Sequence, residues 1–233
     1  MKLLCIILFL VFATPGFAED FVLSAEDILN RMEASFEKIE DYVVTLEATV
    51  KMEGINIPRR EATLFYKKPN KIHIESKGLM FLPKQPMVLN AHYLREKFSP
   101  SSVQKEAINE DNILYKLKLV PKEEGADVRI EIWVEDKHWS IKKMEITRFK
   151  GGTIVAHVEH VMIKGKYCLP RKVLVELTIP ARRRRPHMFE DSGELEDWKE
   201  NDSAEPRKGI VTISFKDYRG VNAGLSDEVF KRK

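Results

Sequence analysis

The chain has 233 residues and a formal net charge of +3, and 43% of its residues are hydrophobic. This length can bury a full hydrophobic core in one large all-β domain or two small ones. Because 39 basic side chains nearly balance 36 acidic ones, overall charge gives no general attraction to nucleic acids or other polyanions.

The first predicted element is a secretory signal peptide over residues 1–18. Lys2 gives a positive start, Leu3–Phe12 is an apolar run, and the small residues Gly16 and Ala18 precede a cleavage position. A bilayer span needs roughly 20 apolar residues, so the run is too short to cross, and an uncleaved anchor is the alternative. We therefore expect a secreted mature chain of residues 19–233, which argues against a nucleic-acid partner.

An amphipathic helix is predicted next, in the sequence LSAEDILNRMEASFEKIEDY. Ser24 is a suitable N-cap, and Leu23 can pack onto Ile28 across the first turn. The apolar stripe of this helix consists of Ile28, Leu29, Met32, Phe36 and Ile39. A helix with one apolar face must cover another apolar surface.

Most of the remaining chain alternates apolar and polar residues with period two, which predicts strands with one buried face. The expected strands lie near residues 42–53, 62–66, 72–74, 113–119, 128–134, 141–149, 154–162, 173–179 and 211–215. Gly151-Gly152 indicates a hairpin turn. Residues 86–97 have no clear pattern, a short helix is expected within 99–112 after Pro100, and Ser226 is expected to cap a final helical turn.

About ten antiparallel strands and one long helix predict a mainly β (α+β) single domain, because no linker separates two domains. Open sheets of this size curl, split or close. An unclosed barrel with the helix over an apolar cavity is one arrangement, and a self-filled two-sheet sandwich is the other. Ten side chains in the apolar phase of their strands are expected to line such a cavity: Val44, Leu46, Val50, Leu64, Tyr66, Ile72, Leu117, Leu119, Ile130 and Ile132.

The sequence ELTIPARRRRPHMFED contains four consecutive arginines, Arg182, Arg183, Arg184 and Arg185. They lie in residues 180–208, a charged insertion expected to form a long loop between the last two strands. An anionic membrane surface attracts each nearby basic side chain by about 1 kcal/mol. The arginines are therefore candidates for docking on an anionic membrane or an acidic partner, and a solvated loop is the alternative.

No pattern in the sequence indicates catalysis or a cofactor. In HVEH, residues 157–160, a strand would place His157 and His160 on opposite faces, where they cannot share one metal ion. The chain contains no GxSxG motif and no glycine-rich phosphate loop. Cys168 is the one cysteine of the mature chain and is expected to be a small buried residue. Trp133 is out of phase with its apolar neighbours and should lie on the opposite face of its strand.

Three stretches give the chain a resemblance to a known family: LFYKKPNKIHIE, YKLKLVPKEEGADVRIEIWVEDKHWSIKKMEI and ISFKDYRGVNAGLSDEVF. Together with the N-terminal helix they resemble, in order, the LolA-like superfamily of periplasmic lipoprotein carriers. The resemblance implies an unclosed β-barrel, with helices over its mouth and a cavity for acyl chains. It favours the half barrel over the sandwich and a periplasmic location.

The resemblance also implies a function and a role for one lysine. Members carry lipoproteins or other lipids without covalent chemistry, between donor and acceptor proteins in the membranes, and we expect a monomer. The carriers have an arginine before the first proline that helps to hold the lid closed, and the matching residue here is Lys68. Its phase with Leu64 and Tyr66 places it on the inward face at the rim, although an exposed surface lysine is the simpler alternative. A lipid-sensing regulator, a structural sandwich and a hydrolase are the alternative functions.

Overall fold

The computed structural model describes residues 23–52, 55–69, 71–76, 91–109, 112–148, 152–179 and 206–231. The helical elements in these ranges are α1 (Ala25–Phe36), α2 (Ala91–Lys97) and the 3-10 helix η1 (Asp227–Phe230). The strands are β1 (Asp41–Met52), β2 (Ile55–Lys67), β3 (Lys71–Ser76), β4 (Phe98–Asn109), β5 (Asn112–Pro121), β6 (Val128–Glu135), β7 (Ser140–Arg148), β8 (Gly152–Ile163), β9 (Tyr167–Ile179) and β10 (Arg207–Arg219).

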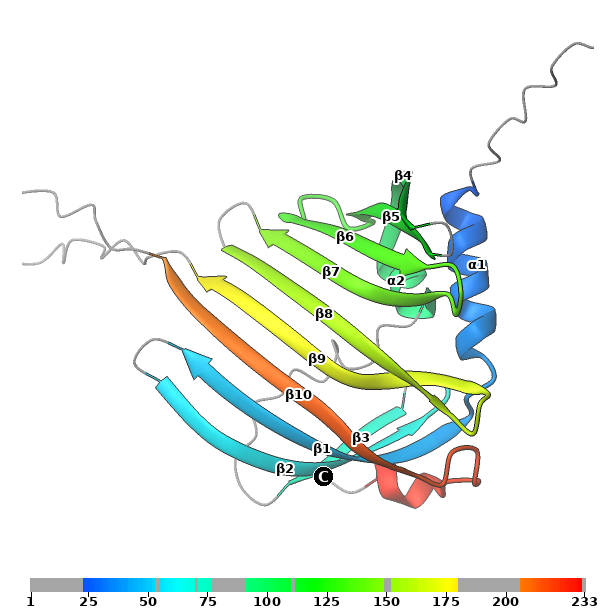
Figure 1. The fold of residues 1–233 in the computed structure, drawn as a ribbon, viewed down its shortest axis with the longest axis vertical. Coiled ribbons are helices and arrows are strands. Elements are labelled where there is room, and N and C mark those ends of the chain that lie inside the picture. The colour runs from blue at the N-terminus through cyan, green and yellow to red at the C-terminus, as the bar shows by residue number, and fades with distance from the viewer. Residues whose placement is uncertain are drawn as a thin grey trace, which may run out of the picture.

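These strands form one antiparallel sheet of ten strands in the order β3-β2-β1-β10-β9-β8-β7-β6-β5-β4. The chain builds one edge with β1–β3 and the opposite edge with β4, and then returns strand by strand until β10 pairs with β1. The sheet is strongly curved, and within the described residues β3 and β4 remain unpaired edges (Figure 1). The predicted unclosed barrel is therefore confirmed, and the two-sheet sandwich is wrong.

The predicted amphipathic helix is α1, and its first turn explains where it begins. The Ser24 hydroxyl accepts a hydrogen bond from the Asp27 amide at 3.1 Å, while the Asp27 carboxylate accepts from the Ser24 amide at 3.2 Å. This reciprocal cap satisfies two backbone donors that would otherwise lack helical partners. Ile28, Leu29 and Met32 are buried against the sheet, as the apolar stripe predicted.

The buried side chains on the concave face form two clusters. The first cluster contains residues of α1 and α2 with inward residues of β5 to β8, among them Leu29, Leu117 and Ile132. The second cluster contains inward residues of β1, β2, β9 and β10, among them Val44 and Leu64. Val173 on β9 packs against both clusters, which therefore adjoin on the middle strands of the sheet.

The short helix expected within residues 99–112 is not found in the described part of that stretch, because Phe98–Asn109 is strand β4. Proline normally disrupts a sheet, since it has no N–H to donate. Pro100 is tolerated because β4 is an edge strand, and the register shifts between Pro100 and Ser102 in a local irregularity. The Ser101 hydroxyl donates to the Lys118 carbonyl at 3.1 Å at this position.

Asp41, at the start of β1, fixes the segment that follows β10. It is 4% exposed, and its carboxylate accepts hydrogen bonds from the backbone amides of Ala223, Gly224 and Leu225 at 3.0, 3.0 and 3.1 Å. Asn222, with a φ of 57°, donates to the Lys38 carbonyl at 2.8 Å. The C-terminal turn is thereby attached to the link between α1 and β1.

We expect Asp41→Ala to lower the free energy of unfolding by about 2–4 kcal/mol, because three charge-assisted hydrogen bonds are lost together. Urea unfolding followed by circular dichroism measures this change. Asp217→Ala is the control, because Asp217 is exposed and forms a surface ion pair with Arg219, and it should change stability by less than about 0.5 kcal/mol. Equal effects of the two substitutions would contradict the role given to Asp41.

Candidate functional site

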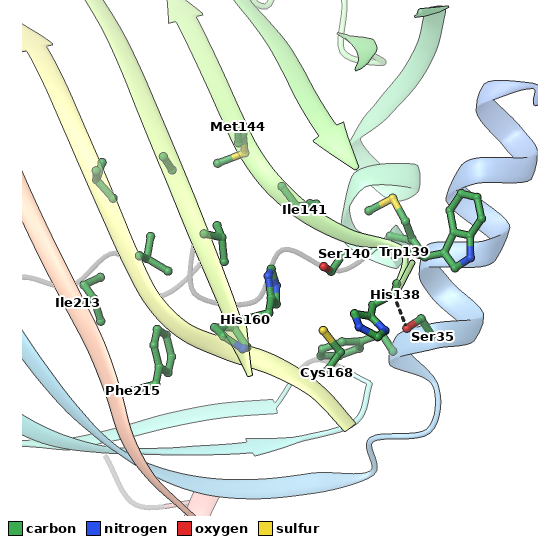
Figure 2. A pocket seen from close by; sticks show the side chains of 18 of the residues that line it. Ser35, His138, Trp139, Ser140, Ile141, Met144, His160, Cys168, Ile213 and Phe215 are labelled. Atoms are coloured by element: carbon green, nitrogen blue, oxygen red, sulfur yellow. Dashed lines mark hydrogen bonds between the residues drawn. The ribbon is translucent and has the colours of Figure 1, made fainter. Parts of the chain in front are cut away.

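A cavity of about 310 Å³ lies on the concave face of the sheet, between the two clusters. Its floor is formed by the middle strands β7 to β10, and α1 closes one end through Met32, Ser35 and Phe36 (Figure 2). Ala91 of α2 also contributes to the wall. The volume falls within the range of about 300–1,000 Å³ that is usual for small-molecule sites.

The wall is apolar along the strands. Its apolar strand residues are Ile141, Met144, Ile146, Ile154, Ala156, Val158, Pro170, Val173, Val175, Leu177, Val211, Ile213 and Phe215. Among the described lining residues there is no aspartate, glutamate, lysine or arginine. Such a wall can bury hydrocarbon. The ligand leaves water for an apolar surface, and no charged side chain of the described wall has to lose its hydration.

Polar side chains of the wall gather towards the α1 end of the cavity. They are Ser35, His138, Ser140, His160 and Cys168 (Figure 2). The Ser35 hydroxyl donates to the His138 carbonyl at 2.8 Å, and the Ser140 hydroxyl donates to the Glu135 carboxylate at 2.6 Å. The first hydrogen bond connects α1 to the turn between β6 and β7, and the second connects the start of β7 to the end of β6.

Trp139 lies in the same turn and forms part of the cavity wall. Its φ of 53° is in the left-handed region, which is uncommon for a bulky residue. The ring stacks on Tyr115 with centroids 5.9 Å apart, and the Arg31 guanidinium lies 4.8 Å from its centroid. These contacts hold the turn against α1 and the first cluster.

His160 on β8 is a largely buried imidazole in an uncharged wall. Burial lowers its pKa to about 4, with a further contribution from the Lys142 ammonium, so the ring is neutral at neutral pH. Its Nδ1 atom is buried without a hydrogen-bond partner among the described residues. Burial also raises the pKa of the Cys168 thiol, which is therefore a poor nucleophile.

None of the ten residues that the sequence predicted as cavity lining belongs to the wall of this cavity. Eight of them are buried in the two clusters on either side of it: Val44, Leu46, Leu64, Tyr66, Leu117, Leu119, Ile130 and Ile132. Val50 and Ile72 are partly buried. These side chains face inward, as the alternation indicated. They do not line the cavity, however, because other side chains of the two clusters fill the space around them.

The sequence also contained the residues of the observed wall. Val173, Val175, Leu177, Val211, Ile213 and Phe215 stand in the alternating patterns that predicted β9 and β10. Alternation identifies the face of a strand on which a side chain lies, but not whether another side chain fills the space opposite it. His160 and Cys168 had no sequence signal that placed them in one cavity.

The two helices over the sheet are joined by Arg95 of α2. Its guanidinium contacts three α1 residues: Glu33 at 2.6 Å, Glu26 at 3.0 Å, and the Asn30 side-chain carbonyl. Phe36 and Ala91 border both the main cavity and a smaller pocket of about 70 Å³ beside Tyr66 and Lys68. Arg95 therefore fastens a helical cover at this end of the cavity.

Lys68 directly follows β2 and contacts the C-terminal end of α1. Its Nζ donates to the Glu37 carbonyl at 3.3 Å and lies 3.5 Å from the carboxylates of Glu37 and Glu40. The side chain is one-third exposed, as expected for a lysine whose stem lies along an apolar rim while its ammonium reaches water. This hydrogen bond joins Lys68 to the C-cap residue of α1, and its effect on opening stays a prediction.

The other candidate residues do not form a catalytic or metal centre in the described part of the chain. His157 is exposed and His160 lies in the cavity wall, so the two histidines occupy opposite faces as predicted. No group of three potential metal-binding side chains occurs within the described ranges. Trp133 is buried on the outer face, where the ammonium groups of Lys116 and Lys143 lie 4.8 and 4.1 Å from its ring centroid.

Two predictions fall outside the described residues: the signal peptide over residues 1–18, and Arg182, Arg183, Arg184 and Arg185 within the 180–208 insertion. Among the described helices, none combines the length and the hydropathy needed to cross a bilayer.

Comparison with solved structures identifies the fold as LolA-like. A LolA superfamily protein from Nitrosomonas europaea superposes with a TM-score of 0.52 over 91% of this chain and 99% of its own, at 11% sequence identity. A DUF1329 family protein from Desulfovibrio piger gives a TM-score of 0.55 over 88% and 95%, at 14% identity. No family model and no curated protein sequence matches the chain. The similarity therefore establishes the fold, and the resemblance found in the sequence is confirmed at that level.

We expect Lys68→Leu to lower the affinity for an apolar fluorescent probe by about threefold while changing the free energy of unfolding by less than about 1 kcal/mol, because the lost contacts are partly exposed. Lys68→Arg should raise the affinity, because a guanidinium presents several donors to the carbonyl and carboxylates at the end of α1. Probe titration and thermal melts compare these variants.

Lys172→Leu is the matched control, since Lys172 pairs with Glu159 on the sheet and does not contact α1. If wild type, Lys68→Leu and Lys68→Arg proved indistinguishable, Lys68 would have no role in holding the cover.

Proposed function

We propose that this protein is a non-enzymatic carrier that shields the acyl chains of a lipid or lipoprotein in the cavity beneath α1. The observation that carries the proposal is the 310 Å³ apolar cavity, which has no charged side chain among its described lining residues. Each methylene group buried in such a space contributes about 0.8 kcal/mol. A chain of several methylenes would therefore bind strongly without any covalent chemistry.

The cover over the cavity suits reversible loading. The α1–α2 contact at Arg95 and the Lys68 contact are ionic and lie at partly exposed sites. Exposed ion pairs contribute about 0–1 kcal/mol each, so releasing these contacts alone costs little, whereas moving α1 away from the sheet would also expose Ile28, Leu29 and Met32.

A lipid-sensing regulator would use the same cavity. A carrier differs from such a regulator because it also delivers the bound lipid to an acceptor membrane. Transfer of a fluorescent lipid from donor to acceptor vesicles supports the carrier if the protein accelerates it in proportion to its concentration. Tight binding without transfer would favour the sensor.

We expect Ala156→Phe to lower the affinity for an apolar probe at least about tenfold, because the added ring occupies cavity volume that would otherwise hold the ligand. Ala156 is 4% exposed and lies on β8 in the middle of the floor. The measurement is saturation binding of the probe after delipidation, with circular dichroism to check folding. Val175→Phe places the same obstruction on β9 if the first variant folds poorly.

Val120→Phe is the matched control, because Val120 is 44% exposed and lies outside the cavity wall. It should leave probe affinity unchanged. An absence of saturable probe binding to the delipidated wild-type protein would refute the carrier proposal.

Export to the periplasm belongs to the same proposal and rests on the signal-peptide pattern of residues 1–18. We expect N-terminal sequencing of the exported protein to begin at Glu19. Retention of Met1 on the exported protein would show that the leader is not removed and would point to an anchored form. Docking of Arg182–Arg185 on an anionic membrane or an acidic partner is a further part of this proposal.

A further inference from the structure

The cavity has two chemically different ends. Ile154, Val175, Leu177 and Val211 lie on paired strands and supply only hydrocarbon. His138, Ser140, His160 and Cys168 supply polar atoms towards α1 (Figure 2). A ligand that satisfies both ends has an apolar chain joined to a small polar group. The donors and acceptors at the polar end determine which polar group of a ligand can bind there.

The hydroxyl protons at the polar end are already used inside the protein. Ser35 donates to the His138 carbonyl and Ser140 donates to the Glu135 carboxylate. The Cys168 thiol is within hydrogen-bonding reach of Ser140, and a thiol is a weak donor. Among the N–H and O–H groups of the wall, His160 is set apart by a buried ring nitrogen without a partner in the described residues, and a neutral imidazole always carries one N–H and one bare nitrogen.

The Nδ1 atom of His160 is buried and has no partner among the described residues. A buried nitrogen without a partner destabilises the empty cavity. A half-turn of the ring about its Cβ–Cγ bond exchanges Nδ1 with a carbon, so this nitrogen can be presented on either side of the ring. A ligand atom that forms a hydrogen bond with the ring would remove the cost of the unpaired nitrogen.

The charges near this end neutralise each other outside the cavity. The Lys142 ammonium lies 2.9 Å from the Glu135 carboxylate, and neither group is among the residues of the cavity wall. Burial keeps the pKa of His160 low, so the ring supplies no positive charge at neutral pH. An ionised carboxylate at this position would lose hydration without gaining a cation, which is unfavourable.

We propose that the polar end of the cavity selects acyl chains whose carbonyl group is uncharged, as in an ester or amide linkage, with His160 as the hydrogen-bond donor. The inference rests on the proposed carrier function and names the ligand chemistry within it. Free fatty acids, whose carboxylates are charged at neutral pH, are rejected although their chains fit the apolar end.

The test measures displacement of an apolar fluorescent probe by a fatty acid, by its methyl ester and by its N-methyl amide, all with one chain length. At about pH 8, where the fatty acid is fully ionised, we expect the wild-type protein to bind the ester or the amide at least about tenfold more tightly than the acid. The tighter of the two neutral ligands identifies the linkage.

The substitution that tests the donor is His160→Leu. It should weaken binding of the preferred neutral ligand about five- to tenfold relative to binding of the probe by the same variant, which is the size of one neutral hydrogen bond. His160→Gln keeps an N–H donor and should retain most of the preference. His157→Leu is the matched control, because His157 is the exposed histidine on the opposite face of the same strand.

Binding of the fatty acid anion as tightly as the ester and the amide overturns the inference while leaving the carrier function intact. The inference is also overturned if His160→Leu and His157→Leu show the same ligand preferences. Failure of the probe to bind the wild-type protein at all overturns the carrier function, and this inference with it.

Discussion

The edges of the sheet, β3 and β4, do not pair with each other, and the rest of the structure depends on this constraint. A sheet of ten strands with one apolar face must remove that face from water, and a closed barrel would do so through its own side chains. Because this sheet stays open, α1 and α2 cover part of the concave face. The helices and the inward side chains of β5 to β8 pack together in the first cluster. The cavity is the part of the concave face that these side chains leave unfilled.

The distribution of charge follows from the same arrangement. Outward side chains of neighbouring strands form ion pairs such as Lys116–Glu131 and Lys172–Glu159, while the described wall of the cavity contains none of the four charged residue types. Charged contacts reach the cavity region at its cover, through Arg95 and Lys68. The described wall is thus uncharged, while partly exposed ionic contacts stand at the edge of the cover.

Much of the fold was predictable from the sequence because periodicity reports burial directly. The period of α1 and the alternation in β1, β5, β6, β9 and β10 identified the elements and their inward faces. Strand β4 was missed, since Pro100 resembles a helix start in sequence and only its position at the sheet edge makes it compatible with a strand. The location of the cavity was mispredicted for a different reason: Leu117 and Leu64 face inward, but other side chains fill the space opposite them. Periodicity describes one strand, whereas empty space depends on how distant elements pack together.

The central claim is that the space beneath α1 holds an acyl chain, and native mass spectrometry of the protein isolated without delipidation tests it most directly. We expect wild-type protein to carry one bound lipid whose release on activation leaves the mass of the bare chain. Ala156→Phe, with the same space obstructed, should be isolated without that lipid. A wild-type protein that is always bare, or a lipid that Ala156→Phe retains to the same extent, would contradict the account.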